Sequence, residues 1–106
     1  MQVLNHKNSI IVRENKIIIY IYDELFLYRP EEINRIAILT TAQRLVNETV
    51  FLVFDVVDDI YLIGLTHPDF DQILLHDLAR FCEVDNHLVI EAMQNKGDKQ
   101  FVLYQK

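Results

Sequence analysis

A chain of 106 residues in which 51% are hydrophobic, with only 2 glycines and 2 prolines, has enough apolar material for one folded domain, 1–106, and is not typical of a disordered protein. The formal net charge is −6 at pH 7, and it is unevenly distributed. Residues 48–91 contain ten acids and one base, Arg80, a net charge of −9, whereas the rest contains six acids and nine bases. Because such a middle segment repels phosphate groups, we do not expect nucleic-acid binding.

The sequence also disfavours a membrane protein, a disulfide-bonded protein and a protein with a cysteine-based zinc site. No apolar run reaches the roughly 18 residues that span a bilayer, and the first ten residues lack an apolar signal core. We therefore expect a cytoplasmic protein with no membrane contact. Cys82 is the only cysteine, which leaves no partner for an intrachain disulfide and too few thiolates for a cysteine-based zinc site.

The first third of the chain predicts a three-stranded β-meander. Residues 1–8 carry little pattern and are expected to be loosely ordered. Apolar and aromatic residues then alternate in three short runs, with polar turn residues between them. The predicted strands are Ser9–Arg13, Lys16–Tyr22 and Leu25–Tyr28.

A helix is predicted next, from Pro30 to Val46. Proline pre-sets a helical φ in a first turn, and the acids that follow Pro30 favour the positive end of a helix dipole. On this helix a second apolar patch would lie apart from the main apolar face, and it consists of Ile33, Ile36 and Ala37. The meander could cover this patch, or the patch could form the interface of a homodimer.

The segment 49–65 predicts the central hairpin of the sheet. Its first run is apolar on both alternating faces, which is typical of a strand covered on both sides. If Asp58 and Asp59 are the two turn residues, Asp55 faces Leu62 across the hairpin. Asp55 would reach solvent or a neighbouring N–H, or alternatively be buried and titrate. Gly64 indicates a bulge or a close backbone approach.

The last part of the chain predicts a second helix and a final hairpin. The helix lies within Thr66–Val84, with Thr66 or Asp69 as its cap and Phe70, Leu74, Leu75, Leu78, Phe81 and Cys82 on its buried side. Strands follow at His87–Met93 and Lys99–Tyr104, with a turn at 95–98. The predicted order is βββαββαββ, an α+β domain with a mostly antiparallel sheet and two helices on one face.

One group of residues has a metal-like composition, namely His67, Asp69, Asp71 and His76. Because His76 lies about two turns beyond His67, helix capping and solvated surface are the expected roles, and no metal or other cofactor is expected. The alternative is a small metal-assisted or acid-base enzyme that uses His67, Asp69 and His76, with or without Asp55. The chain lacks a serine in a glycine-flanked elbow and a glycine-rich phosphate loop, so other catalytic classes are disfavoured.

The acidic middle segment predicts a non-enzymatic protein-binding module, such as an inhibitor, an immunity or anti-defence factor, or a chaperone. Its partner would be a protein with a basic surface. The residues expected to contact this partner are Asp58, Asp59, Asp69, His76, Asp77, Arg80, Glu83 and Asp85. A structural subunit of a larger assembly is a further alternative, with Ile33 and Ile36 in an apolar interface.

Overall fold

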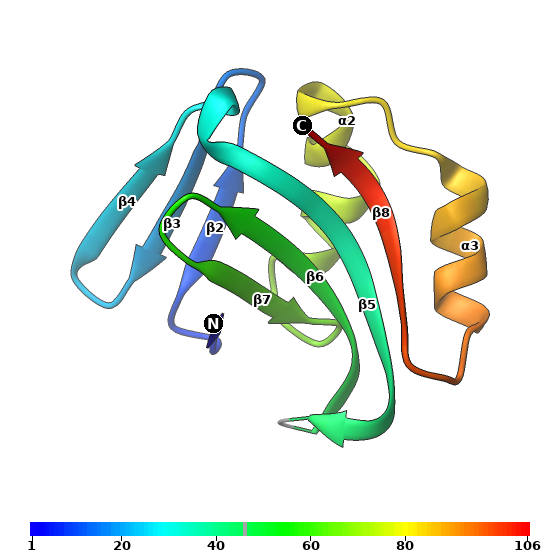
Figure 1. The fold of residues 1–106 in the computed structure, drawn as a ribbon. Coiled ribbons are helices and arrows are strands. Elements are labelled where there is room, and N and C mark those ends of the chain that lie inside the picture. Colours follow the sequence, from blue (N-terminus) through cyan, green and yellow to red (C-terminus); the bar gives the residue numbers. More distant parts are fainter. Residues whose placement is uncertain (46) are drawn as a thin grey trace.

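The computed structural model describes residues 1–45 and 47–106. These residues have the predicted α+β class, with eight strands in mostly antiparallel pairing and two helical regions (Figure 1). The strands form two sheets, and the helices lie together on one side of the larger sheet. In the described part of the chain, no helix combines the length and the apolar character needed to cross a bilayer.

The smaller sheet is the predicted meander, with strands in the order β2-β3-β4. β2 spans Ser9–Val12, β3 spans Ile17–Ile21 and β4 spans Glu24–Tyr28, all antiparallel. The turn between β3 and β4 contains Tyr22 in the left-handed region, at φ 56°. One face of this sheet packs into the protein core through Ile10, Val12, Ile17, Ile19 and Tyr28.

The larger sheet has five strands in the order β1-β7-β6-β5-β8. These are β1 (Gln2–Val3), β5 (Ile33–Leu45), β6 (Glu48–Val56), β7 (Ile60–Gly64) and β8 (Lys99–Gln105). β1 is parallel to β7, and the other pairs are antiparallel. The sequence predicts that residues 1–8 are loosely ordered, but Gln2 and Val3 pair with β7, and both Leu4 and Asn8 are buried.

The predicted helix over 30–46 is wrong. A helical turn does begin at Pro30, but it ends at Glu32: Pro30–Glu32 forms one 3₁₀ turn (η1). In this turn the Glu32 carboxylate accepts the Arg29 backbone N–H at 3.0 Å. The chain then enters β5, where β-branched side chains favour a strand that pairs with β6 on one edge and β8 on the other. Val46, the last residue of the predicted helix, lies outside the described residues.

The oligomer interface predicted at Ile33, Ile36 and Ala37 is also wrong. All three side chains have 0% exposure within a single chain. Ile33 and Ile36 belong to the main core, and Ala37 belongs to a smaller cluster on the opposite face of the sheet. Because these residues pack inside the protomer, they offer no surface to a second chain.

The central hairpin forms as predicted, but with a different turn. Asp55 faces Ile60, and Leu62 faces Val53, so the pairing differs from the predicted register. Asp58 and Asp59 are not the two turn residues: the Val56 N–H bonds to the Asp59 carbonyl at 3.0 Å, so the turn consists of Val57 and Asp58, one residue earlier than predicted. Gly64 pairs with Phe51 without a bulge, and a Cβ there would lie 2.6 Å from the Glu48 Cγ, so a side chain rather than a backbone segment approaches it closely.

β6 is covered on both faces, as its apolar pattern predicts. Phe54 points into the main core and Phe51 into the smaller cluster, and both have 0% exposure. The main core lies between the five-stranded sheet, the three-stranded sheet and the helices. The smaller cluster, on the other face of the larger sheet, consists of Ala37, Phe51, Val53 and Leu62.

The first helical region runs through α1 (Phe70–Gln72), a π-helical turn η2 (Ile73–Asp77) and α2 (Leu78–Phe81). The wider π turn rotates the residues that follow it relative to an ideal α-helix. Ile73 and Leu74 are buried, whereas Leu75, predicted on the buried side, is 64% exposed. Phe70 and Leu78 are fully buried as predicted, and Cys82 is half-buried.

The strand predicted at His87–Met93 is wrong, because this segment forms the helix α3 (Asn86–Gln94). Asp85 caps it: its carboxylate accepts the backbone N–H groups of His87 at 2.9 Å and Leu88 at 3.4 Å. This cap satisfies donors that an isolated helix start leaves open. α3 lies beside β8 (Figure 1) and contributes the buried Ala92 to the core.

Candidate functional site

Three of the residues predicted to contact a partner line one groove, between the first helical region and β2. Asp69, Asp77 and Arg80 belong to the helical side of the groove. Arg13 lies on the opposite side, directly after the last residue of β2. The groove is open and has a volume of about 530 Å³. Its remaining lining residues are Ile10, Ile11, Gln72 and Ile73.

The charges of this groove are balanced. Arg13 and Arg80 are exposed, and within the described residues neither forms an ion pair. Asp77 accepts a hydrogen bond from the Gln72 side-chain amide at 3.0 Å. Ile10 and Ile73 are buried beneath these polar groups. The groove thus offers cations and carboxylates above an apolar floor, and is less acidic than the sequence predicts.

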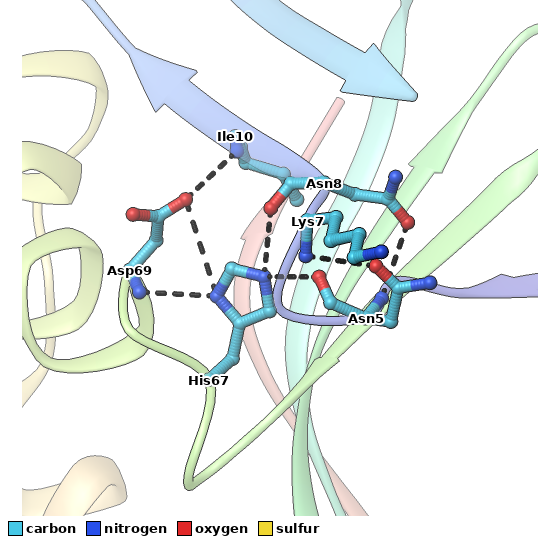
Figure 2. Close-up of polar contacts among 6 residues, drawn as sticks. All are labelled: Asn5, Lys7, Asn8, Ile10, His67 and Asp69. Atoms are coloured by element: carbon cyan, nitrogen blue, oxygen red, sulfur yellow. Dashed lines mark hydrogen bonds and ion pairs between the residues drawn. The ribbon is translucent and has the colours of Figure 1, made fainter. Parts of the chain in front are cut away.

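Asp69 has a structural contact within this groove. Its Oδ2 accepts the backbone N–H of Ile10 at 3.2 Å (Figure 2). In the β2–β3 pairing, the Arg13 N–H bonds to the Lys16 carbonyl at 2.9 Å, which places the N–H of Ile10 on the outer edge of β2. The carboxylate therefore occupies that edge rather than capping the helix, and Asp69 makes no side-chain cap hydrogen bond to α1.

His67 joins the loop after β7 to the segment before β2 (Figure 2). Its Nε2 lies 3.0 Å from the carbonyl oxygens of both Asn5 and Asn8, and its Nδ1 accepts the Asp69 backbone N–H at 3.0 Å. Because the two carbonyls can only accept, Nε2 is the donor to them. The ring is 6% exposed and stacks on His6 with centroids 6.0 Å apart.

This network gives His67 and Asp69 structural roles, because both imidazole nitrogens and one carboxylate oxygen already have partners. His76 is exposed on η2 and is not among the hydrogen-bond partners of His67. Within residues 1–45 and 47–106, no group of three or more His, Cys, Asp or Glu side chains is arranged to hold a metal ion. The structure therefore does not bring His67, Asp69 and His76 together as ligands.

The other predicted contact residues lie elsewhere. Asp59 is on the β6–β7 loop, with its Oδ1 2.9 Å from the Met1 amino group and its Oδ2 accepting the Gln2 amide at 2.9 Å. That ammonium group, followed by the Ile60 backbone N–H, holds the pKa of Asp59 below its usual value. Asp58 is exposed on the same loop, and Asp85 caps α3.

Glu83 lines a different cleft, of about 350 Å³, between the end of α2 and the start of α3. The eight predicted residues are thus distributed over several places, and only Asp69, Asp77 and Arg80 share the groove. Asp55 pairs with Arg35 across β5 and β6, with Oδ2 and Nη2 3.6 Å apart and both side chains 27% exposed. Asp55 therefore reaches solvent and a neighbouring cation, which agrees with the favoured prediction for this residue.

Sequence reasoning missed Arg13 as a residue of the groove. Its place depends on the long-range packing of β2 against the helices, for which the local sequence holds no signal. Comparisons with protein-family models, curated proteins and solved structures found no match to this chain. A functional conclusion therefore rests on the chemistry of the groove and of the molecular surface.

Proposed function

We propose that this chain is a non-enzymatic protein-binding module that receives its partner in the groove between β2 and the first helical region. The observation that carries the proposal is the pair of exposed guanidinium groups, Arg13 and Arg80, which line the groove without an intramolecular ion pair in the described chain. Arginine presents a planar fork of donors that suits carboxylates at protein interfaces. Asp77, which lines the same groove, offers a carboxylate to a cation on the partner.

The partner that fits is a protein whose surface is basic on the whole and which presents at least one carboxylate to the two arginines. A net charge of −6 attracts a basic protein over long range, and this attraction weakens as salt is added. The opposite charges within the groove then favour one orientation of the partner. An inhibitor, an immunity or anti-defence factor and a chaperone would each use such a contact.

The test is quantitative affinity capture from the native host with the wild-type chain and two charge-reversed variants. Arg80→Glu changes the groove, and Arg44→Glu makes the same change of charge at an exposed position on β5, outside the groove. We expect proteins bound by the wild type and by Arg44→Glu to be reduced at least about tenfold with Arg80→Glu, since a buried or partly buried interfacial charge is costly to mispair. Equal capture by Arg80→Glu would overturn the proposal.

A metal-assisted or acid-base enzyme at His67, Asp69 and His76 receives no support from these contacts, because His67 and Asp69 hold the fold together. The two functions differ in a simple measurement. If the groove only binds protein, adding a divalent cation leaves the melting temperature unchanged, because a ligand stabilises a fold only when it binds the native state. A rise with cation concentration would favour the enzyme.

A further inference from the structure

The outer face of the three-stranded sheet is apolar, although it faces away from the core. Ile11, Ile18 and Leu27 form one cross-strand row, and Tyr20 and Leu25 form part of the next. Leu25 is 52% exposed and Leu27 is 48% exposed. In most antiparallel sheets with one solvated face, that face is polar. Contiguous exposed apolar residues of this kind indicate a contact surface.

The edge of β4 is open as well. β4 is the last strand in the order β2-β3-β4, at one side of the molecule (Figure 1). Ile21 and Glu24 flank a two-residue turn and therefore form a hydrogen-bonded pair. By alternation, Phe26 also bonds to β3, while Leu25 and Leu27 direct their backbone N–H and C=O groups away from it. These groups are ready to pair with another strand.

The other sheet edges are protected. β1 has two residues, and β8 carries polar ends, with a register shift where it pairs with β5. The outer edge of β2 is occupied by the Asp69 carboxylate. β4 instead pairs with β3 in an unbroken register, and its stretch from Leu25 to Tyr28 contains neither proline nor charge. Proteins usually blunt an exposed edge with such features, so their lack in this described strand points to a partner.

We propose that β4 pairs antiparallel with β4 of a second copy of this chain, with Phe26 on the two-fold axis. In this register Leu25 lies opposite Leu27 of the second copy, and the two outward-directed residues form a hydrogen-bonded pair. Asp23 lies opposite Arg29 of the second copy, on the same face as the leucines. The two three-stranded sheets become one sheet of six strands, joined by apolar contacts between two ion pairs.

Charge complementarity selects a second copy as the occupant. Acids stand at the start of β4, at Asp23 and Glu24, and a base stands at its end, at Arg29. Arg29 contacts Glu31 and Glu32 through its Nε and has a 67% exposed side chain, so its terminal nitrogens can reach another carboxylate. Antiparallel self-pairing matches the opposite charges, whereas parallel pairing would set like charges side by side. This edge is separate from the groove, and the proposal does not depend on it.

The first test uses size-exclusion chromatography with light scattering over a series of concentrations of the full chain. We expect the wild type to dimerise and Leu25→Lys to raise the dissociation constant at least about tenfold, because a lysine on a strand edge opposes pairing. Leu75→Lys is the matched control, since Leu75 is exposed on η2 and should leave the dimer intact. Melting temperatures check that both variants fold. A wild type that stays monomeric at every concentration, or a dimer that Leu25→Lys leaves unchanged, would overturn the proposal.

The second test examines the register. Asp23→Arg and Arg29→Asp should each weaken the dimer about three- to tenfold, because every reversal affects both symmetry-related pairs and exposed pairs are individually weak. The double variant Asp23→Arg/Arg29→Asp restores the pairing, and a mixture of the two single variants forms mixed dimers in preference to either homodimer. A double variant no tighter than the singles would contradict this register.

Discussion

The two sheets of this protein treat their apolar side chains differently. The five-stranded sheet buries both faces of its central strand β6, with Phe54 in the main core and Phe51 in the smaller cluster, each at 0% exposure. The three-stranded sheet buries only one face, and leaves Leu25 and Leu27 about half exposed on the other. Its strands are nevertheless as apolar as those of the larger sheet.

This contrast separates two uses of hydrophobic residues. In the larger sheet, burial within one chain accounts for every apolar residue of β6 from Val50 to Phe54, on both faces. In the smaller sheet, the inner face is sufficient to attach it to the core, and the outer face is more apolar than a monomer requires. This excess of exposed apolar side chains is the feature on which the proposed pairing with a second copy rests.

The largest expected effect on stability comes from removing one aromatic side chain in each sheet. Phe54→Ala should lower the free energy of unfolding by about 3–5 kcal/mol, because a fully buried aromatic ring leaves a cavity. Phe26→Ala, in the half-buried centre of β4, should cost roughly half of that or less, since less buried area is lost. Urea denaturation measures both. Equal losses would show that the two sheets are buried alike.

A smaller effect is expected where the two sheets are joined through the His67 network. His67→Ala should cost about 2–3 kcal/mol, because the carbonyls of Asn5 and Asn8 and the N–H of Asp69 lose their partner in a buried place. His76→Ala, at an exposed position, is the control and should be nearly neutral. The same urea denaturation applies, and a loss no larger than that of the control would mean that the network does not hold the sheets together.

The second junction between the sheets is sensitive to pH. The hydroxyl groups of Tyr28 on β4 and Tyr61 on β7 lie 2.9 Å apart. Burial, followed by this hydrogen bond, raises the pKa of Tyr28 above its ordinary value of 10.0. A raised pKa in the folded state means that this contribution to stability is complete below pH 10 and is lost as the pH rises above it.

Tyr28→Phe should therefore cost about 1 kcal/mol at neutral pH, because the Tyr61 hydroxyl loses its partner. It should also make the decline of stability above pH 10 less steep than in the wild type. Tyr22→Phe, at a 69% exposed turn residue, controls for the general effect of alkali on tyrosine. Unfolding free energies across this range decide the matter, and parallel curves for the wild type and Tyr28→Phe would exclude a role for this hydroxyl.

The strands that the sequence predicts correctly are those defined by short-range signals. β2, β3 and β4 have alternating apolar residues and close turns, and β6 and β7 have long β-branched or aromatic runs. β5 was missed because the Pro30 signal is local and ends within one turn at Glu32, after which pairing with two strands decides the structure. α3 was missed because Val89 and Ile90 favour a strand, while the Asp85 cap favours the helix that forms.

The candidate groove is predictable only in part, for the same reason. Asp69, Asp77 and Arg80 follow one another on a single helical region, so their proximity can be inferred from the sequence. Arg13 directly follows β2, more than fifty residues earlier in the chain, and only the packed fold brings it to the groove. The structural roles of Asp59 and Asp69 likewise depend on contacts with the N-terminal segment, and no local sequence pattern predicts these contacts.

The smallest expected effect on stability concerns the exposed face itself. Leu27→Ser, at a side chain that is 48% exposed, should change the unfolding free energy of the dilute monomer by no more than about 0.5 kcal/mol. Leu52→Ser makes the same change at a fully buried site in β6, where it should cost several times more. If Leu27→Ser weakens self-association while leaving the monomer intact, the outer face serves a partner; a large loss of monomer stability would instead place Leu27 within the fold's own core.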